Sequence, residues 1–217
     1  MTSAKLETLL NRNYEVKIGK YISRGFEIFK LNLGGFIGFF FLIALITLVL
    51  NLIPILGSIA SSVIGAPLGA GFTFVGLAVI RRQPYTFQDF FKGLSNKYFL
   101  QIFLVSLVGG AITALGLFLL ILPGIYISVC YVFALQIAIN WELDFWEALE
   151  ASRKLISRNW FSMFGFVFVL GLINIGGALL LGVGIFFTAP LTICALLVAY
   201  DDILGNNSDP ILDSMNL

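Results

Sequence analysis

The stretch LNLGGFIGFFFLIALITLVLNLIPILGSIASSVIGAPLGAGFTFVGLAVI, residues 31–80, runs for 50 residues without one charged side chain. Two further uncharged stretches follow at residues 98–141 and 159–200, and they are 44 and 42 residues long. A helix needs about 20 apolar residues to cross a hydrocarbon layer about 30 Å thick, so each stretch is long enough to cross, turn and return. The sequence therefore predicts an all-α, polytopic membrane helix bundle with six transmembrane helices arranged as three hairpins.

The charged side chains predict the orientation of these hairpins. Three hairpins place the four intervening segments on one side of the membrane, and these segments contain all 13 Lys and Arg residues. By the positive-inside rule this side is cytoplasmic, so both termini are expected in the cytoplasm. We expect the bacterial cytoplasmic (inner) membrane, or a thylakoid membrane if the source is a photosynthetic bacterium. The first crossing is expected to be an uncleaved anchor, and five crossings would require one stretch to cross only once.

The composition argues against a soluble globule. Hydrophobic residues make up 59% of the chain and charged residues 12%, and there are 22 Phe residues. In a soluble protein, polar residues interrupt the apolar core residues every few positions along the chain. The three uncharged stretches show no such interruption by charged residues. Cys130 and Cys194 lie inside predicted crossings, where a buried thiol is expected rather than a disulfide or a metal site.

An amphipathic segment precedes each hairpin, at residues 17–30, 86–98 and 143–158. We expect all three to be helices that lie flat at the cytoplasmic interface with their apolar faces in the headgroup boundary. Thr86 and Asp89 have the spacing of a capping box at the start of the second. The chain is therefore predicted to be a single domain of three repeated units, residues 17–80, 86–141 and 143–200, with an acidic tail at 201–217. Common descent of the units and chance similarity both stay open.

Two groups of residues are predicted to serve the interface and the helix contacts. Basic and aromatic residues near the cytoplasmic ends suit binding of anionic lipid, although fixing the topology alone would explain the basic ones. These interface candidates are Lys17, Lys20, Arg24, Arg81, Arg82, Lys92, Trp141, Trp146 and Trp160. Small residues spaced by four, and prolines, suit close helix packing, or alternatively a broken helix that lines a solute path. These packing candidates are Gly34, Gly38, Ser61, Gly65, Gly69, Pro67, Pro123 and Pro190. Pro67 and Pro190 either begin helices or kink them.

Several short motifs resemble a broad bacterial family of six-helix integral membrane proteins. The residues that carry the resemblance are Pro123-Gly124-Ile125-Tyr126, Trp146-Glu147-Ala148-Leu149, Ser152, Leu155 and Asn159-Trp160. That family includes the membrane domain attached to some glycerophosphodiester phosphodiesterases, and the similarity is clearest over residues 120–204. The resemblance implies a six-helix bundle with cytoplasmic amphipathic linkers. It carries over no catalytic residue, because the phosphodiesterase chemistry belongs to a separate soluble domain.

The residue types argue against an enzyme. The chain contains no His, and no charged residue lies at the predicted membrane depth, so the usual general bases and metal ligands are missing there. An acidic group near the cytoplasmic helix ends could hold a divalent cation, although ordinary solvated acids explain it better. These acids are Glu142, Asp144, Glu147, Asp201 and Asp202. We predict no catalytic residue, metal or cofactor.

The predicted function is non-enzymatic work at the cytoplasmic membrane interface, namely binding or organising lipids or partner membrane proteins. The alternative is a passive or facilitated transporter of a small uncharged or amphiphilic solute. The predicted partners are membrane lipids, with other membrane proteins or a second copy of the chain as further candidates, and no nucleic acid.

Overall fold

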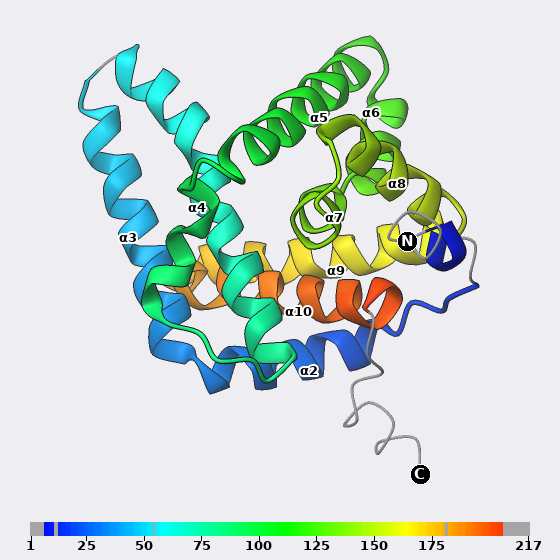
Figure 1. Cartoon of the computed structure of the whole chain (residues 1–217), viewed down its shortest axis with the longest axis horizontal. Coiled ribbons are helices and arrows are strands. Elements are labelled where there is room, and N and C mark those ends of the chain that lie inside the picture. Colours follow the sequence, from blue (N-terminus) through cyan, green and yellow to red (C-terminus); the bar gives the residue numbers. More distant parts are fainter. Residues whose placement is uncertain (1–6, 11–12, 54, 181, 206–217) are drawn as a thin grey trace.

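The computed structural model describes residues 7–10, 13–53, 55–180 and 182–205, and it is all-helical over these residues, with no strand among them (Figure 1). The all-α class is therefore confirmed, while residues 206–217 of the predicted acidic tail lie outside the described residues. The elements in chain order are α2 (Ile18–Leu31), α3 (Leu33–Asn51), α4 (Leu56–Ile80), η1 (Phe87–Leu94), α5 (Phe99–Leu119), α6 (Ile121–Cys130), α7 (Ala134–Trp141), α8 (Phe145–Ser157), α9 (Trp160–Leu179) and α10 (Ile185–Leu204).

Six stretches in the described part of the chain are long enough and apolar enough to cross a membrane. They are Leu33–Asn51, Gly57–Ile80, Phe99–Leu119, Ile121–Trp141, Trp160–Leu179 and Ile185–Leu204. Their number and positions agree with the six crossings expected from the uncharged stretches. The chain is a multi-pass helical membrane protein.

The six spans form three consecutive pairs, α3 with α4, α5 with α6 and α7, and α9 with α10, and the helices of each pair contact each other. We call the first helix of each pair outgoing and the second returning. In the most apolar stretch of each outgoing helix only 11%, 17% and 22% of the residues are buried, against 61%, 44% and 61% in the returning helices. The returning helices therefore form the interior, and the outgoing helices leave most of their apolar surface for lipid.

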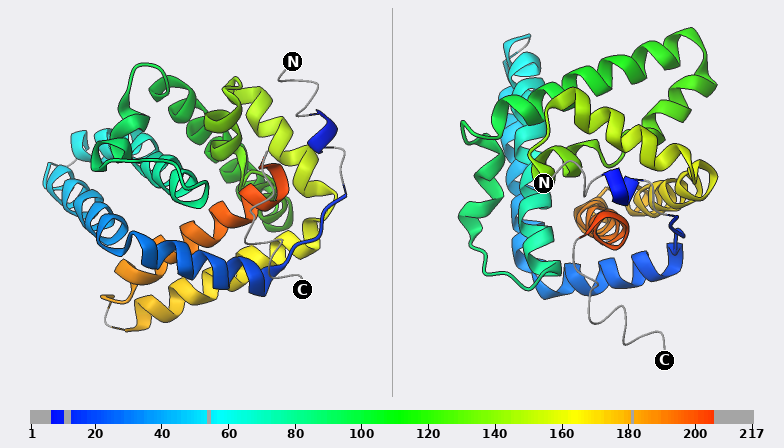
Figure 2. Two further views of the ribbon diagram at one scale, coloured as in Figure 1. Left: turned by 60° about the horizontal axis from the view of Figure 1, so that its bottom comes forward. Right: turned by 45° about the vertical axis from the view of Figure 1, so that its right-hand side comes forward.

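The pairs do not run parallel to one another as in a simple bundle. In Figure 1, α3 and α4 lie at the left, α5 and α6 at the upper right, and α9 and α10 cross the lower part of the molecule. Figure 2 (right) shows α9 and α10 nearly end-on while α3 and α4 are seen lengthwise. The pairs therefore cross one another, and the start of α10 contacts α3, where the rings of Phe186 and Phe40 lie 5.5 Å apart.

Each of the three short helices, α2, η1 and α8, packs on the returning helix of the preceding pair. Helix η1 packs on α4, α8 packs on α7 and α6, and α2 packs on α10 of the last pair, which closes the cycle. In Figure 2 (right) α2 is seen lengthwise while α9 and α10 are nearly end-on, so α2 crosses this pair. Part of each of these helices is thus buried against protein, while Phe87 of η1 and Trp146 of α8 stay exposed, and the expected position at the headgroup boundary stays a prediction.

A small residue allows close approach at each of these contacts. A Cβ atom at Gly25 of α2 would lie 2.5 Å from the Cα of Ala195 in α10, and one at Gly93 of η1 would lie 2.1 Å from the carbonyl oxygen of Pro67 in α4. In α8 the corresponding small residue is Ser152, which is fully buried. Backbones approach this closely only where no larger side chain intervenes.

The second returning helix is broken, which the sequence did not predict. Helix α6 ends at Cys130 and α7 begins at Ala134. The hydroxyl of Ser152 donates to the carbonyl oxygen of Cys130 at 2.7 Å and accepts from the N–H of Phe133 at 3.3 Å. Buried backbone groups must find partners, so this serine stabilises the break. Pro67 and Pro190 lie inside α4 and α10, which answers the question whether they begin these helices.

The predicted packing glycines do not make close contacts within the described residues. A Cβ atom at Gly34, Gly38, Gly65 or Gly69 would meet no atom of a neighbouring helix within 4 Å. Ser61 instead accepts a hydrogen bond from the side-chain amide of Asn51 at 3.3 Å. Spacing by four identifies a face of a helix but does not identify which face meets a neighbour.

Gly25 provides a sharp test of the cyclic packing. Gly25→Ala places a methyl group against the α10 backbone, so we expect a loss of about 1–3 kcal/mol in the free energy of unfolding. The matched change Gly19→Ala, on the same helix, meets no atom within 4 Å and should be neutral or slightly stabilising. Thermal unfolding in detergent measures both. Equal midpoints for the two variants would show that α2 and α10 are not in close contact.

Candidate functional site

A polar junction joins the returning helices where they reach the charged side of the molecule. It consists of Arg81 directly after α4, Asn140 in α7, Asp201 and Asp202 in α10, and Tyr21 in α2. Arg81 donates from Nε at 2.9 Å to Oδ1 of Asp201, and its Nη2 lies 2.8 Å from the same oxygen. Its Nη1 donates to Oδ1 of Asn140 at 2.8 Å. One guanidinium group thus connects all three returning helices.

The second carboxylate of α10 holds the first short helix. The hydroxyl of Tyr21 donates to Oδ2 of Asp202 at 2.6 Å, and the Tyr21 side chain is fully buried. Burial, and then the hydrogen bond to Asp202, raise the pKa of Tyr21 well above its usual value. The hydroxyl therefore keeps its proton and stays a donor, so α2 is fixed to the end of α10.

The structure does not bring the five candidate acids together as a metal site. Glu142 pairs with Lys97, and Asp144 accepts from the amide of Gln101 at 3.0 Å. Asp201 and Asp202 bind different helices of the polar junction. Among the described residues there is no group of three or more acidic, Cys or His side chains placed to hold a metal ion. Four of these acids, all except Glu147, therefore act as separate structural partners.

Three of the predicted interface residues are engaged inside the protein. Arg81 belongs to the polar junction, Trp141 is buried with 9% of its surface exposed, and Arg24 is 8% exposed. Arg24 donates from Nη1 to Glu27 at 2.7 Å. The pattern had placed Arg24 on the polar face of α2, but the buried face includes it, because the contacts of Tyr21 and Gly25 turn this side of α2 toward α10.

The other predicted interface residues lie at or near the surface. Lys17, Arg82, Lys92 and Trp146 are exposed, and Lys20 and Trp160 are half-exposed. The side chains of Lys92 and Asp89 lie 2.8 Å apart, and the N–H of Thr86 donates to Asp89 at 2.7 Å, which confirms the capping box. Hydrogen bonds from Lys92 and then from Thr86 lower the pKa of Asp89, so the cap is ionised at neutral pH.

A small cavity of about 230 Å³ brings two of the predicted bases together beside the polar junction. Arg81 and Lys92 both line it, with Gln83 from the linker and Asn140 from α7. Both bases have carboxylate partners, so the cavity is polar without a strong excess of positive charge. The cavity is therefore polar and close to neutral in charge.

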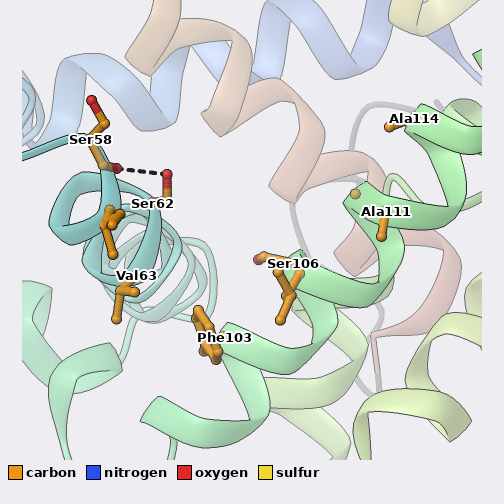
Figure 3. Close-up of a pocket in the computed structure, with 10 residues that line it drawn as sticks. Ser58, Ser62, Val63, Phe103, Ser106, Ala111 and Ala114 are labelled. Carbon is orange, nitrogen blue, oxygen red and sulfur yellow. Dashed lines mark hydrogen bonds between the residues drawn. The ribbon is translucent and has the colours of Figure 1, made fainter. Parts of the chain in front are cut away.

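A larger cavity of about 620 Å³ lies between α4 and α5 (Figure 3), and we call it the α4–α5 groove. Its α4 side includes Ser58, Ser62 and Val63, and its α5 side includes Phe103 and Ser106 together with small residues. A second cavity of about 420 Å³ lies on the other side of α5 and is lined there by Gly109 and Thr113. The two cavities share residues Ser106, Gly110 and Ala114.

No protein-family model, curated protein or solved structure matches this chain. The resemblance to the six-helix family is therefore neither supported nor contradicted. Several residues that carry it have structural roles: Ser152 stabilises the α6–α7 break, the indole N–H of Trp160 donates to the carbonyl oxygen of Tyr126 at 3.2 Å, and Asn159 donates to the carbonyl oxygen of Tyr14. In this fold these motif residues therefore stabilise contacts between separate segments of the chain.

Tyr21 and Asn140 are functional positions that the sequence pattern did not identify, whereas Gln101 was one of the polar residues expected to form hydrogen bonds between helices. Gln101 accepts from the N–H of Phe145 at 3.0 Å and so caps the start of α8 from α5. Asn140 and Gln101 have polar side chains near the charged ends of spans, and this is the sequence feature from which they could be identified as functional positions. Their partners are 43 to 59 residues away along the chain, and no local pattern identifies them.

Two neighbouring arginines allow a matched test of the polar junction. Arg81→Gln leaves Asp201, whose side chain is 8% exposed, without its cationic partner, so we expect a loss of about 3 kcal/mol in unfolding free energy. Arg82→Gln changes an exposed residue and should stay within about 0.5 kcal/mol of the parent. Adding Asp201→Asn to Arg81→Gln should recover most of the loss. Unfolding in detergent measures all three, and equal effects of the two arginine changes would contradict the junction.

Proposed function

We propose that this protein is a non-enzymatic lipid-binding protein of the bacterial inner membrane, or of a thylakoid membrane. It binds or organises lipids or partner membrane proteins at the cytoplasmic interface. The observation that carries the proposal is that basic and aromatic side chains stay exposed on short helices and linkers that are themselves held rigidly by the returning helices. Lys17, Arg82, Lys92 and Trp146 are the clearest of these.

The charge distribution supports a cytoplasmic position for this surface. The three turns between the paired spans contain no ionisable side chain, so every charged residue lies at the opposite ends or in the segments that join the pairs. Anionic lipids of the cytoplasmic leaflet attract such a surface by about 1 kcal/mol for each basic residue close to it. Trp146, which is 56% exposed, has the amphipathic ring that suits the headgroup region.

The contacts of the acidic residues support binding rather than catalysis. Asp201, Asp202, Glu142 and Asp144 each have a specific partner in the structure, and general acid or base chemistry needs a group free to exchange its proton with a substrate. The chain contains no His. These four acids therefore hold together the segments that carry the exposed basic and aromatic side chains.

A solute route is the second candidate function, and the two cavities beside α5 favour it. They share three small or hydroxyl-bearing residues, and the second cavity is also lined by Thr113 and Ser128. Small uncharged or amphiphilic solutes suit such a lining, because no charged group lines either cavity. A passive route requires that the two cavities connect during the transport cycle.

Quenching of tryptophan by brominated lipids tests the proposed function. All three tryptophans lie at the charged ends of the spans, so brominated phosphatidylglycerol should quench the full-length protein more strongly than brominated phosphatidylcholine. The triple change Lys17→Gln, Arg82→Gln and Lys92→Gln should lower the relative binding constant for the anionic lipid by about fivefold for each residue that contacts it.

A charge-conserving triple change, Lys17→Arg, Arg82→Lys and Lys92→Arg, is the control and should keep the preference. An unchanged preference in the Gln triple would leave these bases with a topological role alone. Flux of glycerol into reconstituted vesicles, above that of protein-free vesicles, would favour the solute route instead.

A further inference from the structure

The α4–α5 groove begins where the two helices stop touching. Near their charged ends they meet through Ala70 and Ile102, which pack with Ile139, and the rings of Phe74 and Tyr98 lie 5.0 Å apart. Toward the uncharged ends the helices splay, and the space between them is the groove of about 620 Å³. The groove is therefore closed at one end and wider at the other, and its α5 wall runs from Phe103, one turn from the charged end of α5, to Ala114.

The walls of the groove are apolar in effect, although they contain three serines. The hydroxyl of Ser62 donates to the carbonyl oxygen of Ser58 at 2.8 Å, as Figure 3 shows, so its proton is already used within α4. On the opposite wall, Ser106, Gly110 and Ala114 occur every four residues along α5, and their small side chains leave the space between the helices open. No charged residue occurs in either helix. An occupant therefore gains dispersion contacts and has no strong polar partner.

We propose that the groove holds one acyl chain of a bilayer lipid. The groove has the volume of a small-molecule site, which is about 300–1,000 Å³. A helix of a second protein fits it poorly, because one turn occupies on the order of 400 Å³ and the groove would take little more than one turn. A flexible acyl chain can follow the narrowing space and is present at high concentration on all sides.

This inference deepens the proposed lipid-binding function and rests on it for the class of ligand. The two sites are nevertheless separate, because the groove takes a hydrocarbon chain whatever headgroup that chain carries. A neutral lipid therefore tests the groove without involving the basic surface.

The test uses the full-length protein in vesicles of phosphatidylcholine that carries a photoactivatable diazirine on one acyl chain. After irradiation, mass spectrometry should place adducts several-fold more densely on residues 58–63 and 103–114 than on exposed parts of α9. Filling the groove with Ser106→Leu and Gly110→Leu should remove this excess. A Cβ atom at Gly110 meets no atom within 4 Å, so the added side chain extends into open space.

Two control variants separate the groove from general effects. Gly171→Leu adds one leucine side chain to α9, where a Cβ atom also meets nothing within 4 Å, and should leave the excess unchanged. Ser106→Ala removes the hydroxyl but keeps the groove open, and it should leave the excess unchanged as well. Circular dichroism and size-exclusion profiles equal to those of the parent establish that each variant folds.

Three results would overturn the proposal. Adducts spread evenly over all exposed helices, or an excess that survives in the filled variant, would show that the groove holds no preferred chain. Photo-crosslinks that join two copies of the protein at these residues would assign the groove to a second copy.

The tryptophan experiment separates this proposal from the proposed function. If brominated phosphatidylglycerol and brominated phosphatidylcholine quench the tryptophans equally while the adducts in the groove persist, the basic surface is not a lipid site and the groove proposal still stands.

Discussion

The ion pair between Arg81 and Asp201 is the interaction on which the arrangement of the spans depends. A buried carboxylate is costly unless a partner compensates it, and removing that partner costs more than the pair itself contributes. Here the guanidinium group of Arg81 contacts both Asp201 and Asn140, so the ends of α4, α7 and α10 must all lie within reach of this one side chain. The adjacent bond from Tyr21 to Asp202 extends the same requirement to α2.

The cyclic packing makes the three units one structure. Each short helix completes the buried surface of a returning helix that belongs to another unit, so no unit can bury its own interior alone. Pro67, the α6–α7 break and Pro190 place an irregularity in every returning helix, and Gly25, Gly93 and Ser152 provide a small residue in every short one. The same kind of contact therefore recurs three times around the molecule.

The spans were predictable from the sequence because exclusion of charge from hydrocarbon is a strong constraint that acts along the chain. The capping box of Thr86 and Asp89 was also predictable, because both partners lie within one helical turn. The face of α2 that is buried, the break after Cys130 and the site of close helix contact were not. Those features depend on Ala195, Ser152 and Asp202, which meet their partners only after the chain has folded. Spacing by four therefore selected Gly34 and Gly65, although Gly25 and Gly93 make the contacts.

The position of α2 against α10 has a consequence for biosynthesis. The ribosome makes α2 before all six spans and α10 after the other five, and 153 residues separate the end of α2 from the start of α10. At about 5–20 residues per second, α2 waits on the order of 10–30 s for its partner. During that interval the nascent protein has an uncovered surface around Tyr21 and Gly25, which must be shielded by the translocon, a chaperone or the membrane surface until translation ends.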